Sequence, residues 1–186
     1  PDLVSFDMGG TTAKMCLIKE AEPSMTNTFE IARIHRFKRG SGLPVRVPAI
    51  DLIEIGAGGG STAWVDEMGL LKVGPHSAGA DPGPACYGLA GEQPTVTDAN
   101  LVLGYLNPDY FLGGRMALDV EAAEQAIKPL AAELDLSLLD TARGIHQIVN
   151  QNMISATRVH IAERGEDPRE LALLAFGGAG PIHAYA

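Results

Sequence analysis

Apolar runs that end at glycines recur along the chain and predict short strands followed by tight turns. The first run, residues 3–8, leads through Gly9 and Gly10 into a second strand at 11–18. Another apolar strand, at 170–176, runs directly into a second glycine-rich turn. We also expect a partly exposed strand at 29–39, a buried β-branched strand at 50–55, and a hairpin formed by 63–66 and 70–73.

Apolar positions spaced three and four residues apart predict helices in the second half of the chain. The longest helix begins at its N-cap Ser137 and continues to Arg164. Shorter helices are expected after an N-cap at Thr97 or Asp98 and from Asp119 to about residue 134. The polar face of the long helix, which we interpret as solvated, carries Gln147, Asn150, Gln151, Arg158 and Arg164.

Composition narrows the possible functions. The chain has 186 residues, 46% hydrophobic and 20% charged, which is typical of a globular protein. Its net charge of −9 argues against nucleic acid and membrane surfaces as partners, because both need a basic face. No apolar run reaches the roughly 18 residues of a membrane-spanning helix. Cys16 and Cys86 lie far apart without CxxC spacing, which favours a reducing cytoplasm over a disulfide framework.

The first turn offers the chemistry of a phosphate site. Gly9 and Gly10 can adopt backbone angles closed to other residues and carry no side chain, so backbone amides can approach an anion, and Thr11 and Thr12 add hydroxyl donors. Asp7 stands beside this turn, where its charge tolerates a phosphate only if a divalent cation lies between them. An ordinary Gly-Gly hairpin, which is a common arrangement, explains the same residues, so both interpretations stay open on these residues alone.

Two other stretches are unusually rich in glycine. The four glycines within 56–60 indicate a close approach of a ligand or another segment, or a tight bend between two packed strands. Residues 76–88 combine glycine and proline with few charges, which is typical of a packed and often functional loop. Within it, His76, Asp81 and Cys86 have irregular spacing. We therefore interpret Cys86 as a packed structural thiol rather than a metal ligand or nucleophile.

The turn after the last strand carries Gly177, Gly178 and Gly180, with Pro181 in the first turn of the next helix. A strand, a glycine turn and a helix N-terminus present unpaired amides to an anion or a flat ring. The pattern is not the dinucleotide fingerprint, and it contains no Walker lysine. Alone it identifies no ligand.

Several segments together resemble one protein family. FDMGGTT at 6–12 and FGGAGP at 176–181 resemble the second phosphate motif and the adenosine motif of the actin/Hsp70/sugar-kinase superfamily. The chain resembles more narrowly the hydantoinase A and 5-oxoprolinase family in IGAGGGS at 55–61, SAGADPGPACYG at 77–88, TVTDAN at 95–100, ERG at 163–165 and DPR at 167–169. The resemblance covers nearly the whole chain, and 77–88 is a highly specific part of it.

The resemblance implies an α/β fold with a mixed, ribonuclease-H-like sheet of the actin-like ATPase type. We expect a core at 1–49 and 119–186 and an inserted glycine- and proline-rich subdomain at 50–118. The implied activity is ATP-dependent opening of a cyclic amide such as hydantoin, N-methylhydantoin or 5-oxoproline by phosphoryl activation, with a hydantoinase B-type partner subunit or domain. The alternatives are a subunit of an ATP-dependent ketone carboxylase, of the acetone or acetophenone type, and a non-catalytic actin-like nucleotide-binding module.

The resemblance also implies roles for single residues. Asp7 would be catalytic, holding Mg²⁺ through water or orienting the attacking oxygen. ATP would be held by Gly9, Gly10, Thr11 and Thr12 at its terminal phosphates and by Gly177, Gly178 and Gly180 at its adenosine. Lys14 departs from the family, since relatives often carry an acidic residue there, and the first phosphate motif of the superfamily is missing. We therefore expect a fragment of a longer polypeptide that does not hydrolyse ATP alone.

Overall fold

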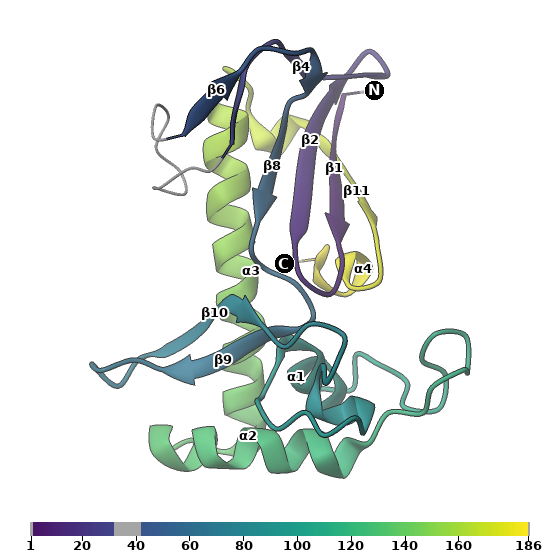
Figure 1. Ribbon diagram of the computed structural model, residues 1–186, viewed down its shortest axis with the longest axis vertical. Coiled ribbons are helices and arrows are strands. Elements are labelled where there is room, and N and C mark those ends of the chain that lie inside the picture. The colour runs from purple at the N-terminus through teal and green to yellow at the C-terminus, as the bar shows by residue number, and fades with distance from the viewer. Residues whose placement is uncertain (1, 32–41, 186) are drawn as a thin grey trace.

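A five-stranded mixed sheet is built around the first strand (Figure 1). The computed structural model describes residues 2–31 and 42–185. In it β1 (Leu3–Met8) pairs in parallel with β11 (Ala172–Phe176) and antiparallel with β2 (Ala13–Lys19). The other edge of β2 pairs with β3 (Glu22–Pro23) and with β8 (Leu52–Ile55). The predicted α/β class and mixed sheet are confirmed. Because β8 belongs to this sheet, we propose that the expected insert begins after Ile55.

The long helix α3 (Leu138–Ala162) lies beside this sheet in Figure 1 and supplies much of its core. The Ser137 side chain caps it by accepting a hydrogen bond from the Asp140 amide at 3.1 Å. The helix buries an apolar stripe, as its three-and-four spacing predicts. The core cluster joins Val4, Phe6 and Met8 of β1 and Met15 and Leu17 of β2 to Ile145, Val149 and Met153 of α3.

The remaining elements lie mostly above or below the main sheet in Figure 1. Three two-stranded pairs are formed by β4 (Met25–Thr26) with β7 (Ala49–Ile50), β5 (Phe29–Ile31) with β6 (Leu43–Val45), and β9 (Ser61–Val65) with β10 (Leu71–Ser77). The other helices are α1 (Val96–Val102), α2 (Val120–Leu134), α4 (Gly180–His183) and the 3-10 turns η1 (Ala85–Tyr87) and η2 (Pro168–Glu170). No helix among the described residues is long and apolar enough to cross a membrane.

Several predictions about burial and boundaries need correction. The strands expected to be buried expose large side chains: Leu52 is 42% exposed and Leu174 is 52% exposed. The reason for β11 is that it pairs only with β1 among the described strands. The strand expected at 29–39 is seen as β5 up to Ile31, and residues 32–39 lie outside the described part. The N-cap of α1 is Thr95, which forms a capping box with Asp98.

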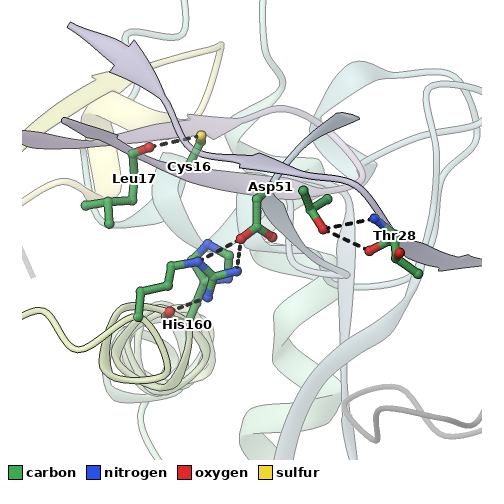
Figure 2. Close-up of polar contacts among 7 residues, drawn as sticks. Cys16, Leu17, Thr28, Asp51 and His160 are labelled. Carbon is green, nitrogen blue, oxygen red and sulfur yellow. Dashed lines mark hydrogen bonds and ion pairs between the residues drawn. The ribbon is translucent and has the colours of Figure 1, made fainter. Parts of the chain in front are cut away.

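The polar face of α3 is not simply solvated. Arg164, expected as its last residue, follows the end of α3 at Ala162, and its guanidinium forms an ion pair with Asp51, which lies between β7 and β8 and is labelled in Figure 2. The Arg164 Nε–H donates to Asp51 Oδ2 at 2.9 Å, and the guanidinium also donates to the His160 carbonyl. Asn150, expected on the same solvated face, is 5% exposed. Both residues therefore hold other elements against the helix.

Candidate functional site

The two glycine turns meet at one edge of the sheet. Because β1 and β11 are parallel, both strands end on the same side, with Asp7 opposite Phe176 in the register. The Ala179 amide donates to the Met8 carbonyl at 2.9 Å, which holds the last turn against the end of β1. Figure 1 shows these strand ends beside α4. Residues at opposite ends of the sequence thus form one surface.

Asp7 lies directly against the second turn. A Cβ atom placed on Gly177 would come within 2.3 Å of Asp7 Oδ1 and 2.6 Å of the Met8 carbonyl oxygen. Gly177 also has φ +82°, a conformation that favours glycine. Gly180 faces the same strand, since its Cβ would lie 3.4 Å from the Phe6 carbonyl oxygen. The half-buried Asp7 carboxylate therefore sits between the two turns.

A third glycine-rich segment supports the first turn from outside the main sheet. The amides of Gly59 and Gly60 donate to the carbonyls of Gly9 and Gly10 at 3.0 and 2.6 Å. A Cβ on Gly58 would lie 2.6 Å from backbone atoms of Gly10 and Thr11. Of the explanations that the sequence leaves open for 56–60, close approach of another segment is therefore the observed one. Thr97 on α1 fixes this segment in turn, because its amide and hydroxyl both donate to the Gly59 carbonyl.

Three other glycines of the two turns have open space where a side chain would be. A Cβ on Gly9, Gly10 or Gly178 would meet nothing within 4 Å. Gly9 and Gly10 also lack a positive φ, so the expectation that they adopt unusual backbone angles is wrong. The Gly9 amide donates to the Thr12 carbonyl at 3.1 Å, whereas the amides of Gly10 and Thr11 donate to no acceptor among the described residues. These two N–H groups are available to an anion.

The residues considered for other chemistry do not form a site. Among the described residues, no group of three or more His, Cys, Asp or Glu side chains could hold a metal ion. Cys86 is fully buried, and burial, with the nearby Asp98, raises its pKa well above the ordinary value, as expected for a packed thiol. Asp98 itself is fully buried and accepts from the amides of Cys86 and Thr95 at 2.8 and 2.9 Å. It attaches the 77–88 loop to α1.

Sequence reasoning missed a buried polar cluster behind the second turn. It consists of Asn100 on α1, His146 and Asn150 on α3, and His183 on α4. The sequence did contain two signals: His183 follows the glycine turn within one helical turn, and His146 and Asn150 stand four residues apart on one helix face. Neither signal shows burial, which arises only when α1, α3 and α4 pack together.

The sequence model of the family described as hydantoinase/oxoprolinase matches residues 1–186. The chain belongs to this family. It is 43% identical to the alpha subunit of caprolactamase from Pseudomonas jessenii over 183 residues, which cover 98% of the chain and 25% of that protein. It is 44% identical to the acetophenone carboxylase gamma subunit of Aromatoleum aromaticum, with 98% of the chain and 24% of that subunit covered.

Two solved structures share the fold of the chain. The nucleotide-free structure of acetone carboxylase matches with a TM-score of 0.86 at 33% identity, covering 99% of this chain and 25% of that one. The ATP-dependent caprolactamase of Pseudomonas jessenii matches with a TM-score of 0.82 at 43% identity, covering 100% and 26%. The chain therefore has the actin-like ATPase fold that the motifs implied. It spans about a quarter of the length of these relatives.

Proposed function

We propose that the chain is the nucleotide-binding part of an ATP-dependent enzyme that opens a cyclic amide by phosphoryl activation. The observation that carries this proposal is the meeting of two glycine turns on either side of Asp7, with the Gly10 and Thr11 amides open to an anion. Such a surface suits a polyphosphate, because free amides and a nearby carboxylate with its cation neutralise and position the charges.

Each turn has a distinct role in this proposal. The first turn, with the amides of Gly10 and Thr11 and the hydroxyls of Thr11 and Thr12, binds the terminal phosphates of ATP. Gly178, which leaves open space, lies beside the adenosine, while Gly177 and Gly180 bring the turn close to β1. Asp7 orients the attacking oxygen or, through water, the metal ion.

A magnesium ion is compatible with these residues. Mg²⁺ is typically bound by one or two carboxylates together with substrate phosphates and water, rather than by a cage of protein side chains. Asp7 supplies one half-buried carboxylate next to the phosphate turn, and no larger metal cluster is present among the described residues. When bound with ATP, such an ion would neutralise phosphate charge. The chain's own residues would fix where that charge lies.

Cyclic amides are the favoured substrates because the family is named for hydantoinases and oxoprolinases and the caprolactamase relative acts on a lactam by its name. A ketone carboxylase is the second candidate, supported by the TM-score of 0.86 to acetone carboxylase. In this proposal both chemistries would begin with ATP-dependent activation of an amide or enol oxygen. The relatives are named as subunits, which supports a partner of the hydantoinase B type.

The decisive experiment measures ATP turnover by the intact protein and its co-purifying subunit with hydantoin, 5-oxoproline, caprolactam, acetone and acetophenone. We expect a cyclic amide to stimulate turnover. Asp7→Asn keeps the size of the side chain but removes its charge, and should lower stimulated turnover by about 100-fold or more, as the loss of a group that stabilises transition-state charge does. Glu121→Gln, on the exposed face of α2, is the matched control and should change nothing.

The outcomes separate the candidate functions. Stimulation by ketones with bicarbonate, and not by amides, would replace the amidohydrolase with the carboxylase. Normal turnover by the Asp7→Asn variant would show that the role given to Asp7 is wrong. Absence of turnover with every substrate, while ATP still binds, would favour the non-catalytic module.

A further inference from the structure

The buried polar cluster behind the second turn is a continuous chain of hydrogen bonds. His146 Nδ1 lies 2.8 Å from Asn100 Oδ1, Asn100 Nδ2 lies 3.0 Å from His183 Nε2, and His183 Nδ1 lies 2.6 Å from Asn150 Oδ1. All four side chains are at most 5% exposed. The two imidazole rings stack with centroids 4.6 Å apart. Three helices, α1, α3 and α4, are joined by this cluster.

The amide groups decide which ring nitrogens carry protons. An amide oxygen can only accept, so Nδ1 of both His146 and His183 must be an N–H donor. The Asn100 amide nitrogen can only donate, so His183 Nε2 is an acceptor. Burial lowers the pKa of both histidines, which keeps them neutral near pH 7. His146 Nε2 therefore carries a lone pair at the end of the cluster.

That lone pair accepts the Tyr185 hydroxyl at the edge of a pocket of about 620 Å³. His146 Nε2 lies 3.1 Å from the Tyr185 hydroxyl, which lies 2.8 Å from the Tyr105 hydroxyl. The two hydroxyl oxygens keep lone pairs and form an acceptor edge beside aromatic faces, since the ring centroids of Tyr105 and His146 are 5.0 Å apart. The volume is within the 300–1,000 Å³ typical of small-molecule pockets.

The side chains of Gln147 and Gln151 also line the pocket, make no hydrogen bond within residues 2–31 and 42–185, and can donate through their amide groups. Arg143 also lines it, but its guanidinium already pairs with Asp140 at 2.6 Å. Because no other cationic side chain in the described part of the chain lines the pocket, a neutral polar ligand fits better than a phosphate.

We propose that this pocket binds an uncharged cyclic amide, with the ligand N–H on the acceptor edge formed by the hydroxyl oxygens of Tyr105 and Tyr185 and its carbonyl on the Gln147 and Gln151 amides. A cyclic amide presents this combination of an N–H donor and a carbonyl acceptor on one small ring. The inference rests on the proposed function for its ligand class. It adds a location, because the hydrogen-bonded cluster runs from this pocket to His183, on the helix that follows the second glycine turn.

The test is calorimetric titration of the intact protein with hydantoin and caprolactam, together with the KM for the amide in ATP turnover. His146→Asn keeps a donor for Asn100 but removes the acceptor that orients the Tyr185 hydroxyl, and Tyr105→Phe removes one hydroxyl. Each should raise Kd and KM about tenfold, the usual effect of one lost hydrogen bond, and leave kcat within about twofold. The controls are His76→Asn and Tyr110→Phe, both on exposed side chains outside the pocket.

The results distinguish this inference from the proposed function. Amide-stimulated turnover with unchanged KM in both pocket variants would overturn the pocket while leaving the function intact. Amide binding that weakens in both variants, without any amide-stimulated turnover, would support the pocket and overturn the function. Absence of amide binding to the unsubstituted protein would overturn the pocket directly. Circular dichroism confirms that each variant is folded before it is scored.

Discussion

Two groups of glycines lie at the same edge of the sheet and differ in their surroundings. Gly58 and Gly177 are crowded: a Cβ would meet backbone or carboxylate atoms at 2.6 and 2.3 Å. Gly10 and Gly178 are open, with nothing within 4 Å of the same position. Contacts inside the chain explain why the first two positions are glycine, but they do not explain the other two.

The comparison indicates where a ligand can approach the backbone. Crowded glycines allow the three glycine-rich segments to pack on one another and to hold Asp7 between them. Open glycines leave backbone amides uncovered, and their lack of a side chain has no packing or conformational reason within the described chain. Glycine content alone therefore does not identify a phosphate site, but the open subset marks the surface on which we place ATP.

The largest change in the free energy of unfolding is expected from adding a side chain at a crowded glycine. Gly58→Ala would place a methyl group 2.6 Å from Gly10 and Thr11 backbone atoms, where an ordinary contact needs at least 3.4 Å. Because backbone cannot rotate out of the way as a side chain can, the free energy of unfolding should fall by about 3 kcal/mol. Chemical denaturation followed by circular dichroism measures this change. A loss below about 0.5 kcal/mol, the usual range for surface substitutions, would show that the segments are not packed as described.

The sequence predicted the parts of this arrangement that depend on local pattern. The hairpin through Gly9 and Gly10, the N-cap at Ser137 and the buried stripe of α3 all follow from periodicity and turn chemistry. Burial of β11 was predicted wrongly, because an apolar run does not show whether a strand lies at an edge. The sequence predicted a close approach at 56–60, but it could not show which segment approaches Gly58, nor the cluster around His183, since both arise from contacts between segments distant in sequence.

A second test concerns His183 in the cluster behind the second turn, where polar side chains rather than glycines fill the space. Burial, with a contribution from His146, lowers the pKa of His183 to about 4 from an ordinary 6.5. The unfolded chain therefore binds a proton that the folded chain does not, so this stability is complete above pH 6.5 and is lost as pH falls toward 4. Between pH 7.5 and 5 the free energy of unfolding should decrease by about 2 kcal/mol because of this one group.

Denaturation curves at these two pH values measure that dependence. The difference between them should shrink by most of this amount in His183→Asn, which cannot be protonated in this range. It should remain in His76→Asn, which removes an exposed histidine of the same type. Equal pH dependence in the two variants would mean that the His183 ring is not buried and neutral in the folded protein.

The smallest change in the free energy of unfolding is expected from an alanine substitution at an open glycine. Gly10→Ala adds the same methyl group as Gly58→Ala, but into open space at a residue without a positive φ. The free energy of unfolding should therefore stay the same or rise by about 0.5 kcal/mol, because alanine restricts the unfolded chain. ATP should bind about tenfold more weakly, since the methyl group would occupy the surface on which the phosphates are placed. If Gly10→Ala binds ATP as tightly as the unsubstituted protein, the open space above the first turn is not the phosphate site, whatever its amides could offer.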